Sequence, residues 1–205
     1  YKGGFIVPIL LTLLILVLTF SIERFITIRA ANGKGNMSKH MRNMQVLIST
    51  SRIDEAIEAC NTQGGTVSNV IVSVLHKYQE LAKSKNMDKE QKVLKLQLEL
   101  EDSTELELPM LEKNLTILAT IASISTLMGL LGTVLGMIRS FAALAHAGAP
   151  DSVALATGIS EALINTAFGI TGSTLAIIMY NYFSSTIDGY TFKIDEAGFS
   201  LTQTF

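Results

Sequence analysis

One carboxylate stands almost alone in a long apolar stretch of the sequence. Residues 153–183 number 31 and include a single charged side chain, Glu161. On a helical wheel at about 100° per residue, Asn165 lies on the same face as Glu161. An ionisable side chain inside a bilayer is costly, and such residues usually mark an ion or substrate pathway. The pattern indicates proton or ion chemistry at membrane depth, and the alternative is a structural carboxyl that joins helices.

Two hydroxyl side chains extend this candidate pathway. At a rise of 1.5 Å per residue, Thr133 and Glu161 each lie roughly 9 to 10 Å from the middle of their apolar stretches, so two antiparallel helices would hold them at similar depth. Thr166 lies about 7.5 Å further toward the other side and points about 140° away from Glu161. Thr166 and Glu161 can line one pore only if neighbouring helices share it, which hints at an oligomer.

Composition argues against several other kinds of site. The 205 residues include 16 basic and 18 acidic side chains, and the net charge of −2 gives no electrostatic case for nucleic-acid binding. The single cysteine, Cys60, cannot form an internal disulfide or a cysteine-based metal cluster, and we expect no metal and no cofactor. The glycine-rich stretch 129–136 lacks the lysine of a phosphate-binding loop. No Ser/His/Asp set lies at membrane depth, so we do not expect an enzyme.

The charges are concentrated in one part of the chain. Of the 16 basic and 18 acidic residues, 13 of each fall within 23–113. Three charge-poor stretches remain, at 5–22, 115–138 and 153–183, and a helix needs about 20 apolar residues to cross a bilayer. A signal peptide is the alternative for the first stretch, but no small-residue cleavage site precedes Glu23. We therefore predict an all-α polytopic membrane protein with three transmembrane helices and a cytoplasmic helical extension.

The distribution of basic residues predicts the orientation of the chain. Five Lys and Arg side chains follow the first stretch within 20 residues, whereas 140–152 contains none. The positive-inside rule then places the basic segment in the cytoplasm. The predicted order is a first transmembrane helix with a short periplasmic N-terminus (1–22), a cytoplasmic helical segment (23–114), a second transmembrane helix (115–139), a periplasmic turn (140–152), a third transmembrane helix (153–183) and a cytoplasmic helical tail (184–205).

The cytoplasmic segment is predicted to consist of several helices. We expect an amphipathic helix over 51–60, with Ser51 as its N-cap and Cys60 as a buried apolar residue, a redox role being the alternative. A second helix is expected over 67–81. Residues 95–101 alternate with period two, yet they are strong helix formers and should form a helix. Pro109 should kink or interrupt the helix that leads into the second span.

Small residues line one face of each of the last two predicted spans, and large apolar residues lie opposite. Gly132 and Gly136 form a G-x-x-x-G pair, a pattern that lets helices approach closely in membranes. We expect the small faces to meet protein and the large apolar faces to meet lipid. The glycines predicted to pack helices are Gly129, Gly132, Gly136, Gly158, Gly169 and Gly172.

Two stretches of this sequence resemble the signatures of the MotA/TolQ/ExbB proton-channel family, most closely its ExbB branch. Leu118–Phe141 reads LATIASISTLMGLLGTVLGMIRSF, and Gly158–Phe183 reads GISEALINTAFGITGSTLAIIMYNYF. Glu107–Leu115 is similar to the family's cytoplasmic lead-in, ELPxLE. Asn165 departs from the pattern because a small apolar residue is familiar there, and Arg139 stands where a neutral or weakly basic residue is familiar.

The resemblance implies a function and a set of partners. It implies that Glu161 is the family's intramembrane glutamate and that Thr133 and Thr166 are its pore threonines. It also implies a homopentamer in the bacterial inner membrane, around a dimer of an ExbD-like single-span protein whose aspartate takes up and releases protons. Such a complex would use the proton motive force to drive a TonB-like protein and outer-membrane transport. A TolQ-like or other motor role, or a passive membrane scaffold, is the alternative, and the choice between protons and Na⁺ stays open.

Overall fold

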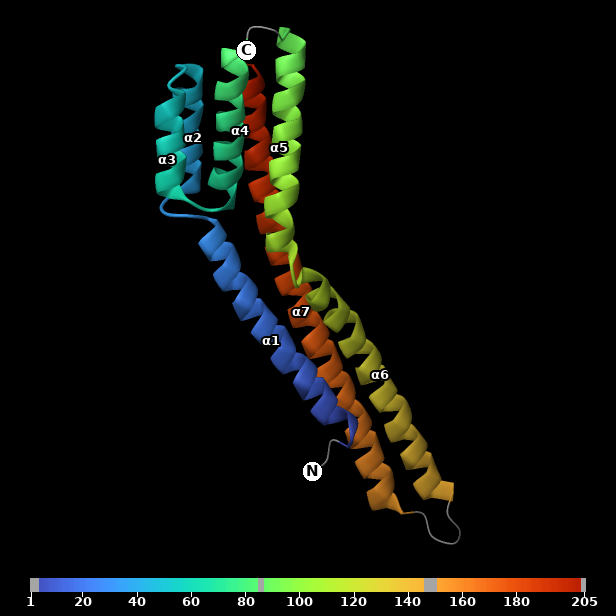
Figure 1. The fold of residues 1–205 in the computed structure, drawn as a ribbon. Helices are drawn as coiled ribbons and strands as arrows, with labels where there is room; N and C mark the ends of the chain where they lie inside the picture. Colours follow the sequence, from blue (N-terminus) through green and yellow to red (C-terminus); the bar gives the residue numbers. More distant parts are fainter. Residues whose placement is uncertain (1–3, 85–86, 146–150, 204–205) are drawn as a thin grey trace. The chain divides into compact units, whose positions relative to one another are not determined.

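The computed structural model describes residues 4–84, 87–145 and 151–203, and within these ranges it contains seven helices and no strand (Figure 1). The predicted all-α fold is therefore confirmed. Three segments are long and apolar enough to cross a membrane, as predicted: α1 (Ile6–Ala31), the segment Lys89–Ala145 and α7 (Ser152–Thr202). The second of these comprises α5 (Lys89–Glu112) and α6 (Leu115–Ala145).

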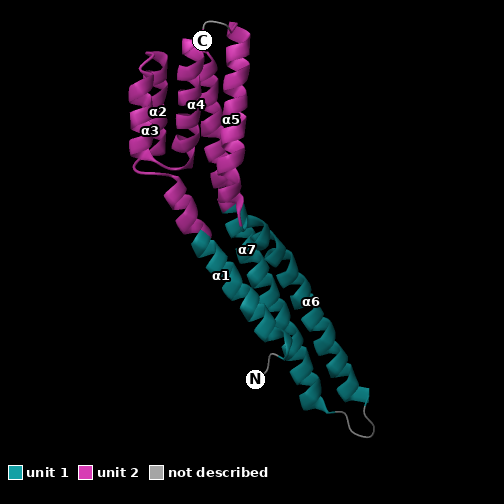
Figure 2. Cartoon of the chain, viewed as in Figure 1, with its two compact units in different colours: residues 1–23, 114–182 teal, residues 24–113, 183–205 magenta. Residues whose placement is uncertain are grey.

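The chain divides into two compact units, coloured separately in Figure 2. The first contains residues 1–23 and 114–182, and the second contains residues 24–113 and 183–205. The apolar parts of α1 and α7 and the whole of α6 belong to the first unit, which is called the apolar unit below. The second, called the charged unit, holds most of the Lys, Arg, Asp and Glu side chains.

Four helices of the charged unit pack in chain order, α2 on α3, α3 on α4 and α4 on α5. The sequence predicts helices in the α3, α4 and α5 regions but not in that of α2, whose N-cap Asn36 accepts a hydrogen bond from the Lys39 amide at 3.2 Å. Buried residues recur at helical spacing in α2 and include Met37, Met41 and Met44. The bounds of these new elements are α2 (Met37–Ser49), α3 (Ile53–Gln63) and α4 (Thr66–Lys83).

The prediction that Ser51 caps the start of α3 is wrong. Ser51 has a φ of 56°, in the left-handed region, and its amide donates to the Ile48 carbonyl at 3.0 Å. The next amide, of Arg52, donates to the Leu47 carbonyl at 2.9 Å. These bonds satisfy the last carbonyls of α2, so Ser51 ends the preceding helix instead of starting the next. α3 begins at Ile53 without a side-chain cap.

Pro109 does not end α5, which continues through it to Glu112. The interruption falls at Asn114, whose φ of 68° is left-handed, and α6 begins at the next residue. In the charged unit the buried guanidinium of Arg24 donates to the carbonyls of Met110 at 3.3 Å and Leu111 at 3.0 Å. A cation at the negative end of a helix satisfies its unpaired carbonyls and stabilises its dipole.

The end of α7 is helical to Thr202, as predicted for the tail. Its apolar positions at helical spacing are buried in the charged unit, and the Tyr190 hydroxyl donates to the Ile28 carbonyl at 3.2 Å. α7 therefore belongs to both units. Its 51 residues include an apolar stretch in the apolar unit and an amphipathic stretch in the charged unit. The buried tail residues are Phe183, Ile187, Tyr190, Ile194, Ala197 and Leu201.

Cys60 is fully buried, as predicted, and we expect it to be chemically inert in the folded protein. Its thiol lies 3.5 Å from the Met44 sulfur and 3.7 Å from Nε2 of His40, and burial raises the pKa of Cys60 to about 12. The thiolate is the reactive form, so at pH 8 an aromatic disulfide reagent should label native Cys60 about a thousandfold more slowly than the unfolded chain. Equal labelling rates in native and denatured protein would instead support an accessible, redox-active thiol.

Candidate functional site

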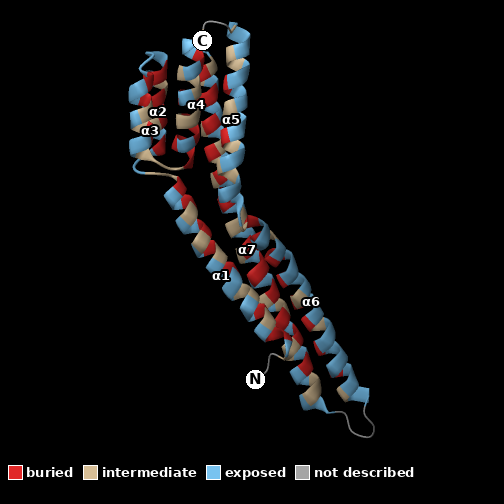
Figure 3. Ribbon diagram, viewed as in Figure 1, coloured by how far each residue is buried: buried red, intermediate tan, exposed pale blue. Residues whose placement is uncertain are grey.

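Small residues bring α6 and α7 into close contact within the apolar unit. A Cβ atom added to Gly129 would lie 3.0 Å from the Cα of Gly169, and one added to Gly169 would lie 2.7 Å from the Ser125 carbonyl oxygen. These partners are backbone atoms, so neither position has room for a side chain. Figure 3 shows the buried positions that recur along both helices. The structure places all six predicted glycines here: Gly129, Gly132, Gly136, Gly158, Gly169 and Gly172.

Asn165 lies inside this contact. Asn165 is 1% exposed, and its side chain fills the space beside Gly132. Its Oδ1 atom is buried without a hydrogen-bond partner in the described part of the chain, and so is the Ser125 hydroxyl further along α6. A buried polar atom is normally paired, because leaving it unpaired costs about 1 to 3 kcal/mol. Asn165 Oδ1 is therefore an unused acceptor enclosed in the contact between α6 and α7.

Glu161 forms an ion pair with Arg139 that no pattern in the sequence predicts. Arg139 Nη1 lies 2.8 Å from Glu161 Oε1, and the carboxylate side chain is 13% exposed whereas that of Arg139 is 56% exposed. Gly4, just before α1, approaches from another side, and a side chain there would overlap the Glu161 carboxylate. Three segments of the apolar unit, from α6, α7 and the start of α1, therefore meet at this carboxylate.

The two threonines lie near Asn165 along the contact. The Thr133 hydroxyl donates to the Leu130 carbonyl at 2.6 Å, and the Thr166 hydroxyl donates to the Ala162 carbonyl at 3.3 Å. Both residues are half-buried. Each hydroxyl donates its hydrogen bond to a carbonyl of its own helix. The lone pairs of its oxygen can still accept from another donor or bind a cation.

The depth predicted for Thr133 needs correction. Gly132 packs against Asn165, which sets the antiparallel register and puts Thr133 close to the level of Asn165. Glu161 lies four residues, about 6 Å, nearer the start of α7 than Asn165. The carboxylate is consequently nearer to the level of Arg139 than to that of Thr133. The sequence estimate was off because it measured each depth from the middle of its own apolar stretch, and the register between α6 and α7 does not bring these two middles to the same level.

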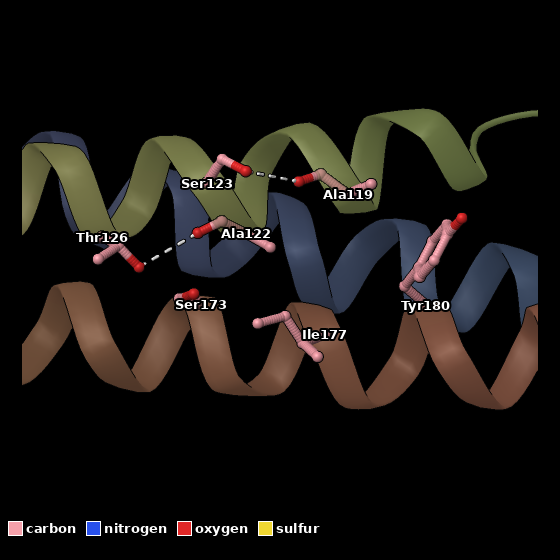
Figure 4. A pocket seen from close by; sticks show the side chains of 7 residues that line it. All are labelled: Ala119, Ala122, Ser123, Thr126, Ser173, Ile177 and Tyr180. Atoms are coloured by element: carbon pink, nitrogen blue, oxygen red, sulfur yellow. Dashed lines mark hydrogen bonds between the residues drawn. The ribbon is translucent and has the colours of Figure 1, made fainter.

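A separate cavity of about 350 Å³ opens between α6 and α7, toward the other ends of their apolar stretches (Figure 4). Ser123 and Thr126 line it from α6, and their hydroxyls donate to the carbonyls of Ala119 and Ala122 at 3.4 Å each. Ser173, Ile177 and Tyr180 line it from α7. None of the predicted pathway residues lines this cavity, and no sequence motif pointed to it.

The chain matches a known protein family over the helices that carry this site. Residues 68–196 match the MotA/TolQ/ExbB proton channel family. The chain is 40% identical over 90 residues to a putative biopolymer transport protein ExbB-like 3 from Synechocystis, a match that covers 43% of each protein. It is 38% identical over 81 residues to the biopolymer transport protein ExbB of Pseudomonas putida, covering 40% of this chain and 25% of that protein.

Relatives with a different name are equally similar. The match to the Tol-Pal system protein TolQ of Pseudomonas aeruginosa is 45% identical over 75 residues, covering 37% of this chain and 32% of that protein. The matched stretches thus span less than half the length of these relatives, and they do not separate ExbB from TolQ. The family match extends from α4 to the end region of α7 and includes Thr133, Glu161 and Thr166. The chain therefore belongs to the MotA/TolQ/ExbB proton channel family.

Proposed function

We propose that this chain is an ExbB-like subunit of a proton-driven motor in the bacterial inner membrane, coupling the proton motive force to TonB-dependent outer-membrane transport. The observation that carries the proposal is Glu161, a nearly enclosed carboxylate on a small-residue helix contact in a proton-channel family. Glu161 shapes the field along the pathway. Thr133, Thr166 and the unpartnered Asn165 oxygen provide polar groups for hydration.

The proposed assembly follows the family resemblance. Five copies surround two single-span ExbD-like subunits, whose membrane aspartate takes up and releases the proton, and a TonB-like protein receives the work. The N-terminus and the connection at 140–152 face the periplasm. The charged unit faces the cytoplasm, because five basic residues follow the first span. Residues 146–150 of that connection, and both chain ends at 1–3 and 204–205, lie outside the described residues.

Two other functions have specific observations in their favour. A TolQ-like role in a Tol-Pal system is supported by the 45% identity to TolQ. A passive membrane scaffold is supported by the ion pair, since a carboxylate matched to Arg139 is what a structural role would need. The first alternative changes the partner that receives the work, and the second removes ion flow altogether.

Reconstitution with the partner separates a motor from a scaffold. The chain is co-purified with a single-span ExbD-like protein of the same organism, sealed into vesicles, and tested for acidification of the lumen under an imposed proton gradient. We expect flux that needs both proteins and falls to the background of empty vesicles when the partner's membrane aspartate is changed to asparagine. Flux that is unchanged by that substitution, or no flux above empty vesicles, would favour the scaffold. Replacing the proton gradient by a Na⁺ gradient tests the ion.

A further inference from the structure

The Arg139–Glu161 pair brings opposite charges together in the apolar unit. Arg139 Nη1 and Glu161 Oε1 are 2.8 Å apart, so the two side chains form a hydrogen-bonded ion pair. Outside residues 23–113, Arg139 is one of only three basic side chains in the chain. A charge in an apolar helix segment is costly alone and less costly when paired with its opposite. The two residues therefore balance each other within one subunit.

Backbone contacts on both sides fix the geometry of this pair. One turn before Arg139, Gly136 packs against the Gly158 carbonyl and Ala162. Immediately after it, the Ser140 hydroxyl donates to the Leu155 carbonyl at 3.1 Å. These contacts lock the register of α6 against α7, so the Arg139 side chain reaches Glu161 without any helix moving. The pair is thus built into the subunit fold.

The surroundings of the carboxylate leave it few other positions. Gly4 has a φ of 65° and lies so close that any side chain there would collide with the Glu161 carboxylate. Gly4 precedes the first turn of α1, and the amino end of a helix carries partial positive charge. The carboxylate therefore lies close to both Arg139 and the segment that begins α1, and the glycine lets the chain approach it.

From these contacts we propose that Arg139 is the internal counter-ion and positioning residue of Glu161. It pairs with the carboxylate and holds it in one place, so that Glu161 is a fixed group beside the pathway while the moving proton is carried elsewhere. The cationic head is itself half exposed and available to water. This inference deepens the proposed function and rests on it for its link to ion flow. The pair itself can be tested without any flux.

The test uses the chain co-purified with its single-span partner and five variants: R139Q, R139K, E161Q, the double variant R139Q/E161Q, and I138Q. Ile138 is exposed on the same turn as Arg139, so I138Q is a matched control that adds the same amide without removing a charge. Three quantities are measured: thermal stability, the infrared stretch of protonated carboxyl groups, and gradient-driven flux.

We expect R139Q to create a protonated-carboxyl band that is missing from the wild type and from R139Q/E161Q. The flux of R139Q should fall about tenfold, because the nearly enclosed Glu161 carboxylate would lose its partner and its fixed position. R139K should retain most of the flux, since it keeps the charge, and I138Q should match the wild type. In stability, the double variant should be less impaired than the sum of the two single variants.

Two results would overturn the inference. R139Q could show no new carboxyl band and the same melting temperature and flux as I138Q, or the single-variant effects on stability could be simply additive. If instead the wild-type complex conducts nothing, the proposed function fails. The infrared band and the stability cycle would still show whether Arg139 is the counter-ion of Glu161.

Discussion

Glu161→Ala is expected to abolish gradient-driven flux and the work that depends on it, while the subunit still folds and assembles. The loss should exceed about a hundredfold, the effect seen when a preorganised charge is removed from an enclosed site. Folding should tolerate the change because the stranded Arg139 head is 56% exposed and can turn to water along its flexible stem. Flux in vesicles and growth on a nutrient that needs outer-membrane transport measure the loss, and gel filtration of the complex measures assembly.

Two controls identify the cause of the loss. Leu163→Ala truncates a neighbouring side chain of α7 that is 66% exposed, and it should leave flux unchanged. The double variant Arg139→Ala with Glu161→Ala removes the stranded cation as well, and it should remain inactive if the carboxylate itself is required. Recovery of flux in this double variant would show that the unpaired arginine caused the defect. Normal flux in Glu161→Ala would contradict the role proposed for the carboxylate.

Much of the fold could be predicted because its patterns are long and local. The charge-free stretch 115–138 and the stretch 153–183, whose one charge is Glu161, predict apolar helices by length alone. The small-residue faces also predict which sides of α6 and α7 meet, and Gly129 and Gly169 do meet there. The tail could be predicted because its buried residues recur at a helical period over five turns. In each case the signal is repeated many times, so single exceptions such as Gly189 do not hide it.

The features that the sequence does not predict depend on short patterns or on contacts between distant residues. Serine is a common N-cap residue, yet the left-handed backbone of Ser51 is set by the turn that closes α2. α2 is short and follows a turn, and its few methionines do not by themselves distinguish a helix from a loop. Pairing Arg139 with Glu161 requires the register between two antiparallel helices to within a residue. That register is fixed by contacts such as Gly136 with Gly158, which no single-helix pattern reveals.

Gly169→Val should strongly destabilise the apolar unit at its small-residue contact. The added Cβ would lie 2.7 Å from the Ser125 carbonyl oxygen and 2.8 Å from the Cα of Gly129, and backbone atoms cannot move aside as a flexible side chain can. Overpacking of this kind costs about 1 to 3 kcal/mol and more where the backbone must separate. We expect a lower melting temperature of the purified protein in detergent and weaker assembly with the single-span partner.

The glycines of α7 supply a graded set of controls for this argument. Gly189 has nothing within 4 Å of an added Cβ, so Gly189→Ala should be neutral or stabilise the helix by up to about 1 kcal/mol. A Cβ added to Gly172 would lie 3.3 Å from the Ser125 hydroxyl oxygen, which can turn away. The stability of Gly172→Ala should therefore fall between those of Gly189→Ala and Gly169→Ala. Gly169→Ala should already lower the melting temperature, because its Cβ alone would collide with backbone atoms of α6. If all three alanine variants melt alike, α6 and α7 do not pack this closely in the membrane, and Glu161 and Arg139 lose the register that joins them.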